Sequence, residues 1–114
     1  MAVLPIAVWE QHPYWVPELL RELQPLGARV MTCRVEGDVA RRVAEGVRQV
    51  VIALPHEERL PWRSLDRWVE IGLRVHVVLD PADESYRWFL HELGVTSVFD
   101  FDGARAALVR ACVG

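Results

Sequence analysis

Gln49-Val50-Val51-Ile52-Ala53-Leu54 is one of several short apolar runs in this 114-residue chain. After Gln49 the run is continuously apolar, which is typical of a strand whose two faces are both covered in a parallel sheet. Comparable runs, rich in Val, Ile and Leu, occupy residues 3–9, 28–33, 74–79 and 96–99. The sequence therefore predicts five strands.

Between and after these runs lie segments whose apolar residues recur at helical spacing. We expect Asp38 to lie at the cap or first turn of the second helix, Ser64 to cap the third, and residues 83–85 to open the fourth. Glycine follows each of the first four segments, in the usual place of a left-handed C-terminal cap. The five apolar sets are Trp15, Leu19, Leu23 and Leu26; Val39, Val43 and Val47; Leu65, Trp68, Val69 and Gly72; Tyr86, Phe89, Leu90 and Leu93; and Ala104, Leu108 and Ala111.

The chain thus repeats a strand and a helix five times. Such alternation favours a parallel sheet with helices on both faces, joined by right-handed crossovers. We predict a single α/β domain over residues 1–114, a three-layer α/β/α (βα)5 arrangement of the flavodoxin-like type. The strand order 2-1-3-4-5 is expected by analogy with folds of this kind.

Composition narrows the classes of function. The net charge is −3, and all 13 basic residues are arginines against 16 acidic residues, so no basic excess points to nucleic acid. No apolar run has the length of a membrane span, and the N-terminus lacks the features of a signal peptide. We expect a cytoplasmic protein that binds neither nucleic acid nor membrane. Cys33 and Cys112 are far apart in sequence and are interpreted as two reduced, partly buried thiols.

With this organisation, the chain resembles the receiver domain of bacterial response regulators from Val3 to about Cys112. Residues 51–55, Val-Ile-Ala-Leu-Pro, resemble the third receiver strand and the proline after it. Residues 94–99, Gly-Val-Thr-Ser-Val-Phe, resemble the fifth strand, and Phe101-Asp102 resembles the start of the last helix. The resemblance implies a receiver fold and a role in signalling or regulation.

The resemblance does not extend to the residues that carry out phosphotransfer. A receiver is phosphorylated on an aspartate that ends its third strand, where this chain has Ala53 or Leu54. A receiver ends its fifth strand with a lysine that pairs with the phosphoryl oxygens. Here that place is taken by Phe99 or Asp100, and an aspartate there would repel an acyl phosphate.

The magnesium-binding positions of a receiver are also altered. A receiver has a pair of acids after its first strand, because Mg²⁺ prefers carboxylate oxygens. Here Glu10 is followed by Gln11 and His12, and the Ser or Thr that ends the fourth receiver strand is replaced in Leu79-Asp80. We therefore predict a degenerate pseudo-receiver, without enzymatic activity, catalytic residues or a cofactor.

An alternative hypothesis is a small-molecule or divalent-metal-binding protein, possibly an enzyme. Ligands of open α/β sheets bind at the carboxyl ends of the strands. Glu10, His12, His56 and Asp80 all come after predicted strands, and imidazole with carboxylate suits Zn²⁺ or a similar ion. Against this, polar loops are common at sheet ends, and no metal-binding spacing is present. Nor does a glycine-rich loop come after the first strand, which disfavours nucleotide binding of the Rossmann kind.

Trp88 is unusual on the fourth predicted helix. It lies about 160° or more from the middle of the apolar face at helical spacing. An exposed tryptophan is the kind of residue that anchors an interface. The other interpretations are that Arg87 or Arg74 covers it, or that the helix starts elsewhere. In receivers, the surface of helix 4, strand 5 and helix 5 is the usual partner and dimer face. Our leading hypothesis is phosphorylation-independent docking of a protein partner or second copy through Trp88, Arg87 and His91.

Overall fold

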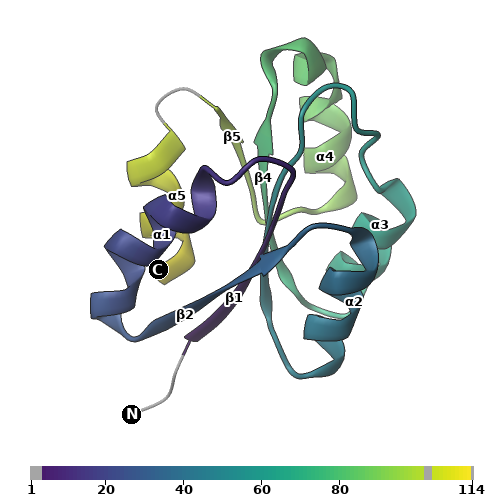
Figure 1. Cartoon of the computed structure of the whole chain (residues 1–114). Coiled ribbons are helices and arrows are strands. Elements are labelled where there is room, and N and C mark those ends of the chain that lie inside the picture. The colour runs from purple at the N-terminus through teal and green to yellow at the C-terminus, as the bar shows by residue number, and fades with distance from the viewer. Residues whose placement is uncertain (1–3, 102–103, 114) are drawn as a thin grey trace.

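Five parallel strands form one sheet in the order β2-β1-β3-β4-β5 in a computed structural model that describes residues 4–101 and 104–113 (Figure 1). The predicted fold class and strand order are therefore confirmed. The bounds of the strands are β1 Leu4–Glu10, β2 Ala28–Cys33, β3 Gln49–Ala53, β4 Arg74–Leu79 and β5 Ser97–Asp100.

Helices cover both faces of the sheet and make it three-layered (Figure 1). Helices α1 and α5 lie on one face, and α2, α3 and α4 lie on the other. The α-helices are α1 Trp15–Leu23, α2 Glu36–Ala44, α3 Trp62–Glu70, α4 Arg87–Leu93 and α5 Ala104–Val113. Two short 3₁₀ helices, η1 Gln24–Leu26 and η2 Pro81–Tyr86, lie directly after α1 and directly before α4. None of the helices in these described stretches is long and apolar enough to cross a membrane.

The central strand β1 shows why the apolar runs are continuous. Ile6 and Val8 pack in the cluster beneath α1 and α5, whereas Ala7 and Trp9 pack in the cluster beneath α2, α3 and α4. Successive side chains of a strand point to opposite faces, and here both faces are covered. The sheet is thus buried on two sides, as the apolar runs predict.

Parallel pairing brings the carboxyl ends of the strands to one edge of the sheet. Glu10 of β1 pairs with Ala53 of β3, and Leu79 of β4 pairs with Asp100 of β5. The loops after these residues therefore lie along a common edge, where ligands of open α/β sheets bind.

Three expectations for the earlier helices need correction or refinement. Leu26, expected on an apolar face, is 64% exposed because it lies in the 3₁₀ helix after α1. Val47 is buried, but it lies after α2 in the loop that leads into β3. Ser64 does not cap α3: the N-cap is Pro61, whose carbonyl accepts a 2.9 Å hydrogen bond from the Leu65 N–H. Asp38 lies in the first turn of α2, as predicted.

The fourth helix begins later than its apolar pattern indicates. Residues 83–85, expected to open it, belong to η2. A 3₁₀ helix has about three residues per turn, so the side chains after η2 face other directions than an α-helix from residue 83 would give them. Tyr86, predicted to be on the apolar face, is the last residue of η2 and is exposed. Phe89, also predicted there, is exposed although its neighbour Leu90 is fully buried, because the two side chains point about 100° apart on α4 and only that of Leu90 meets the core. Trp88 is 63% exposed, which agrees with its predicted place away from the core.

Gly94 ends α4 with a φ of 99°, in the left-handed region that the sequence pattern predicts for this cap. A Cβ at this position would lie 3.1 Å from Cγ1 of Val69 on α3. Close approach of α3 and the left-handed turn therefore both favour glycine here.

Candidate functional site

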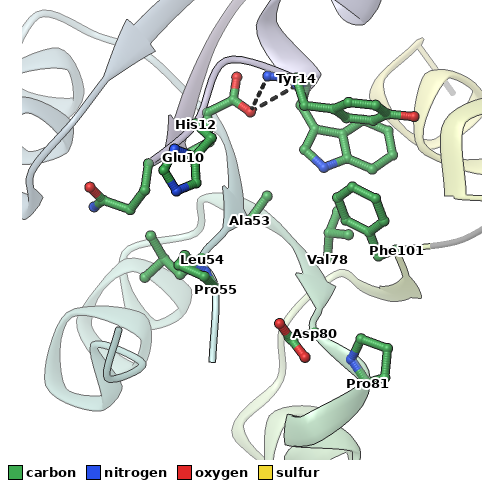
Figure 2. A pocket seen from close by; sticks show the side chains of 12 residues that line it. Glu10, His12, Tyr14, Ala53, Leu54, Pro55, Val78, Asp80, Pro81 and Phe101 are labelled. Atoms are coloured by element: carbon green, nitrogen blue, oxygen red, sulfur yellow. Dashed lines mark hydrogen bonds between the residues drawn. The ribbon is translucent and has the colours of Figure 1, made fainter. Parts of the chain in front are cut away.

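A pocket of about 330 Å³ opens at the carboxyl ends of β1, β3 and β4. Most of its wall is apolar. Figure 2 shows Leu54 and Pro55 on one side of it and Phe101 on the other, with Asp80 near Pro81 on its lower rim. The lining residues are Glu10, Gln11, His12, Tyr14, Trp15, Ala53, Leu54, Pro55, Val78, Asp80, Pro81 and Phe101.

Glu10, the last residue of β1, uses its carboxylate to hold the start of α1. Its Oε1 accepts hydrogen bonds from the backbone N–H groups of Tyr14 at 3.0 Å and Trp15 at 2.8 Å (Figure 2). Its Oε2 accepts one from Val16 at 2.8 Å. These N–H groups have no acceptor within the helix, so a buried carboxylate here caps α1. This role was not predicted from the sequence, because it depends on how β1 and α1 meet in space.

The end of β3 carries no acidic side chain. Ala53 is the last residue of the strand and pairs in register with Glu10. Leu54 comes next and is buried in the cluster beneath α2, α3 and α4. Neither of the two residues that could stand at a receiver's phosphorylated position has a side-chain oxygen to accept a phosphoryl group.

Asp80, directly after β4, is engaged with backbone N–H groups. Its Oδ1 accepts a hydrogen bond from Ala82 at 2.9 Å and caps η2, and its Oδ2 accepts one from His56 at 3.3 Å. This carboxylate ties the loop after β3 to the loop after β4.

The end of β5 carries a negative charge. Asp100 ends the strand, and its carboxylate forms an ion pair with Arg87 of α4. Arg87 also pairs with Glu84 and donates a 3.3 Å hydrogen bond to the carbonyl of Val98. The arginine thus joins η2, α4 and β5, a contact that the sequence pattern does not indicate.

The four residues proposed as metal ligands do not form one cluster. Glu10, His12 and Asp80 line the pocket, but both oxygens of Glu10 are held by α1. His56 lines a neighbouring pocket, where its Nδ1 lies 2.8 Å from Oδ1 of the buried Asp83. Among residues 4–101 and 104–113, no three His, Cys, Asp or Glu side chains are placed to hold a metal ion.

The surroundings of one histidine and of both cysteines shift the pKa values of these side chains. The hydrogen bond to Asp83 and the charge of that carboxylate raise the pKa of His56. Burial raises the pKa of the Cys33 and Cys112 thiols to about 11. Because the thiolate is the reactive form, burial disfavours nucleophilic reaction of either thiol at neutral pH.

The surface of α4 presents two adjacent aromatic rings. Trp88 and Phe89 are 63% and 56% exposed, and their rings meet edge to face with centroids 5.2 Å apart. Arg87 is turned toward Glu84 and Asp100, while Arg74 donates to the carbonyl of Ala111 at 2.8 Å. The two arginines that the sequence offered as a cover for Trp88 are therefore engaged elsewhere.

No family model and no curated protein matches this chain. Solved structures do. A response regulator receiver domain protein from Clostridium thermocellum superposes with a TM-score of 0.75 at 14% identity, over 97% of this chain and 92% of that one. The chain has the receiver fold. A response regulator from Thermotoga maritima gives 0.71 at 13% identity, over 99% of this chain and 100% of that one.

A third similar structure is the receiver domain of the sensor histidine kinase PA1611 from Pseudomonas aeruginosa PAO1, with a magnesium ion coordinated in its active site cleft. Its TM-score is 0.62 at 24% identity, over 97% of this chain and 95% of that one. Identities at this level establish the shared receiver fold alone. What the chain does must be argued from its own side chains.

Proposed function

We propose that this protein is a pseudo-receiver, a phosphorylation-independent module that acts in signalling or regulation through contacts with other proteins. The observation that carries the proposal is the end of β3, where Ala53 and Leu54 stand in place of a phosphorylated aspartate. The proposed role is binding, without catalysis.

The charges around Ala53 also oppose phosphotransfer. Phosphorylation of a carboxylate needs a nucleophilic oxygen, Mg²⁺ held by free carboxylate oxygens, and cations that stabilise the transferred group. Both oxygens of Glu10 are committed to α1, and Asp100 would repel a phosphoryl group. Arg87 is already paired with two carboxylates.

The exposed rings of α4 support a docking role. A tryptophan can bury about 150–250 Å² in an interface, and Trp and Arg are enriched among residues that dominate binding energy. Trp88 follows Arg87 in α4, and the exposed His91 lies one turn further along the same helix. We propose that this face, formed by α4, β5 and α5, docks a protein partner or a second copy of the chain.

The phosphorylation-independent part is tested by amide NMR. Mg²⁺ is titrated first, and beryllofluoride, which mimics an aspartyl phosphate, is added next. We expect the resonances of Glu10, Ala53 and Asp80 not to move. A phosphorylatable receiver domain in the same buffer is the positive control. Saturable shifts at these three residues would contradict the proposal.

The docking part is tested by sedimentation velocity over a wide range of concentrations. We expect Trp88→Ala to weaken self-association, whereas Leu26→Ala, a truncation at a residue of matched exposure, leaves it unchanged. If the wild-type chain remains monomeric, we assign the face to a different protein, and the binding of that protein must then depend on Trp88. This part of the proposal is contradicted if Trp88→Ala equals wild type both in self-association and in binding of that protein.

A further inference from the structure

The pocket at the carboxyl ends of β1, β3 and β4 has features that a protein-docking role does not use. Three aromatic rings stand together on its wall: the ring centroids of Tyr14 and Trp15 lie 4.9 Å apart, and those of Tyr14 and Phe101 lie 5.0 Å apart. Ala53 contributes only a methyl group to the lining, so space is left where a larger side chain would stand. The volume of about 330 Å³ lies at the small end of ligand-binding pockets.

The pocket is open to solvent on its aromatic side. Tyr14 and Phe101 are 46% and 41% exposed, although both rings are large and apolar. Trp15 beneath them is 1% exposed and packs in the core, which fixes the position of the wall. A flat apolar ring laid against Tyr14 and Phe101 would remove exposed aromatic surface from water.

The charges on the lining favour one class of ligand. Among the described residues of the lining, Glu10 and Asp80 are acidic, His12 contributes an imidazole, and none is an arginine. Glu10 is 2% exposed and its carboxylate accepts three N–H groups of α1, whereas Asp80 is only half-buried, so Asp80 is the carboxylate left for a ligand. Each oxygen of Asp80 accepts one backbone hydrogen bond and retains further acceptor capacity. A cation is attracted both by this carboxylate and by the faces of the aromatic rings.

We propose that this pocket binds a small aromatic amine, with its ring against Tyr14 and Phe101 and its protonated nitrogen directed to Asp80. This binding role goes beyond the proposed docking role and does not depend on it. Phosphate and other anions are disfavoured as occupants, because the described lining offers two carboxylates and no arginine, and the imidazole of His12 is the one basic group there.

Three probes with the same ring separate charge from shape. Benzylamine, benzyl alcohol and benzoate are titrated into the protein and monitored by amide NMR. We expect benzylamine to bind in the millimolar range, as befits so few atoms, with shifts confined to residues around Ala53, Val78 and Asp80. Benzyl alcohol should bind several-fold more weakly, and benzoate weakest of all. Shifts of equal size for benzoate, or shifts spread over the surface, overturn the proposal.

Variants then locate the bound ring. Ala53→Leu should abolish benzylamine binding by filling the pocket, whereas Ala106→Leu adds the same side chain at an exposed position of α5 and should have no effect. Phe101→Ala removes a half-exposed ring without entering the core and should weaken binding at least threefold, which keeps the test valid if Ala53→Leu does not fold.

Asp80→Asn tests the partner of the amine. It should weaken benzylamine about tenfold and leave benzyl alcohol nearly unchanged, because the loss is one charge-assisted hydrogen bond. Benzylamine binding that survives both Phe101→Ala and Asp80→Asn unaltered overturns the proposal.

Discussion

The two ends of the parallel sheet use buried polar side chains in the same way, yet they differ in the space around them. At the amino end, Oε1 of Gln49 lies 2.9 Å from Nε2 of His76, and its Nε2 donates a 2.8 Å hydrogen bond to the carbonyl of Cys112 in α5. At the carboxyl end, Glu10 accepts hydrogen bonds from the start of α1. Each network ties a helix to the sheet.

The difference lies in what surrounds each network. Gln49 and His76 are 2% and 0% exposed and are enclosed by packed side chains. Beside Glu10, the lining of Ala53 and Val78 leaves a pocket open. Buried polarity alone therefore does not identify a functional site in this protein. The open space beside Glu10 is what distinguishes the carboxyl end, and it lies where open α/β folds bind ligands, which is why we propose a ligand there.

The largest effect should come from removing the network at the carboxyl end. Glu10→Ala leaves three N–H groups at the start of α1 without their acceptor, and we expect it to lower the free energy of unfolding by about 3 kcal/mol. Urea unfolding monitored by circular dichroism measures the change.

Glu22→Ala on the same helix is the control for that experiment, because Glu22 is exposed. It should change the free energy of unfolding by less than about 0.5 kcal/mol. If Glu10→Ala lowers the free energy of unfolding no more than Glu22→Ala does, the cap does not stabilise the fold. The buried polar groups would then not have the same role at the two ends of the sheet.

The network at the amino end should respond to pH. Burial lowers the pKa of His76 to about 4 in the folded protein, below the value of about 6.5 in an unfolded chain. The neutral ring is therefore favoured by folding, and its contribution to stability is complete above about pH 6.5 and is lost as the pH falls from there toward about 4. By linkage the loss reaches about 2–3 kcal/mol at the lower limit.

Urea unfolding of wild type and His76→Gln at several pH values isolates this contribution. The glutamine does not titrate, so the stability difference between the two proteins should shift in favour of the variant as the pH falls. If the difference in free energy of unfolding between wild type and His76→Gln stays constant from neutral pH down to about pH 4, His76 is not held neutral by burial in the folded protein.

The sequence predicts features that follow from a local pattern of residues, and it does not predict contacts that depend on how the elements meet in space. The fold was predictable because continuous apolar runs such as Val50–Ile52 report burial on both faces. The cap made by Glu10 was not, because it depends on where α1 starts relative to β1. Exposure of Trp88 was predicted from helical spacing, but that of Phe89 was not, because spacing alone does not show that Leu90 lies at the centre of the buried face and Phe89 at its edge.

The smallest effect concerns the histidine at the carboxyl end. Asp83 lies 2.8 Å from Nδ1 of His56 and raises the pKa of that imidazole, which is the opposite direction from His76. Its contribution to stability is present below about pH 6.5 and is lost as the pH rises through the folded pKa. NMR titration of the ring protons should give a midpoint above about 6.5, and Asp83→Asn should lower it.

The contribution of His56 to stability is expected to be small, because its side chain is 59% exposed and solvent screens the pair. The titration midpoint of His56 is therefore the sensitive measurement. A midpoint of His56 that does not change in Asp83→Asn would show that the two residues do not interact in solution. His56 would then differ from His76 only in its burial. The link between the loops after β3 and β4 would rest on the hydrogen bonds of Asp80.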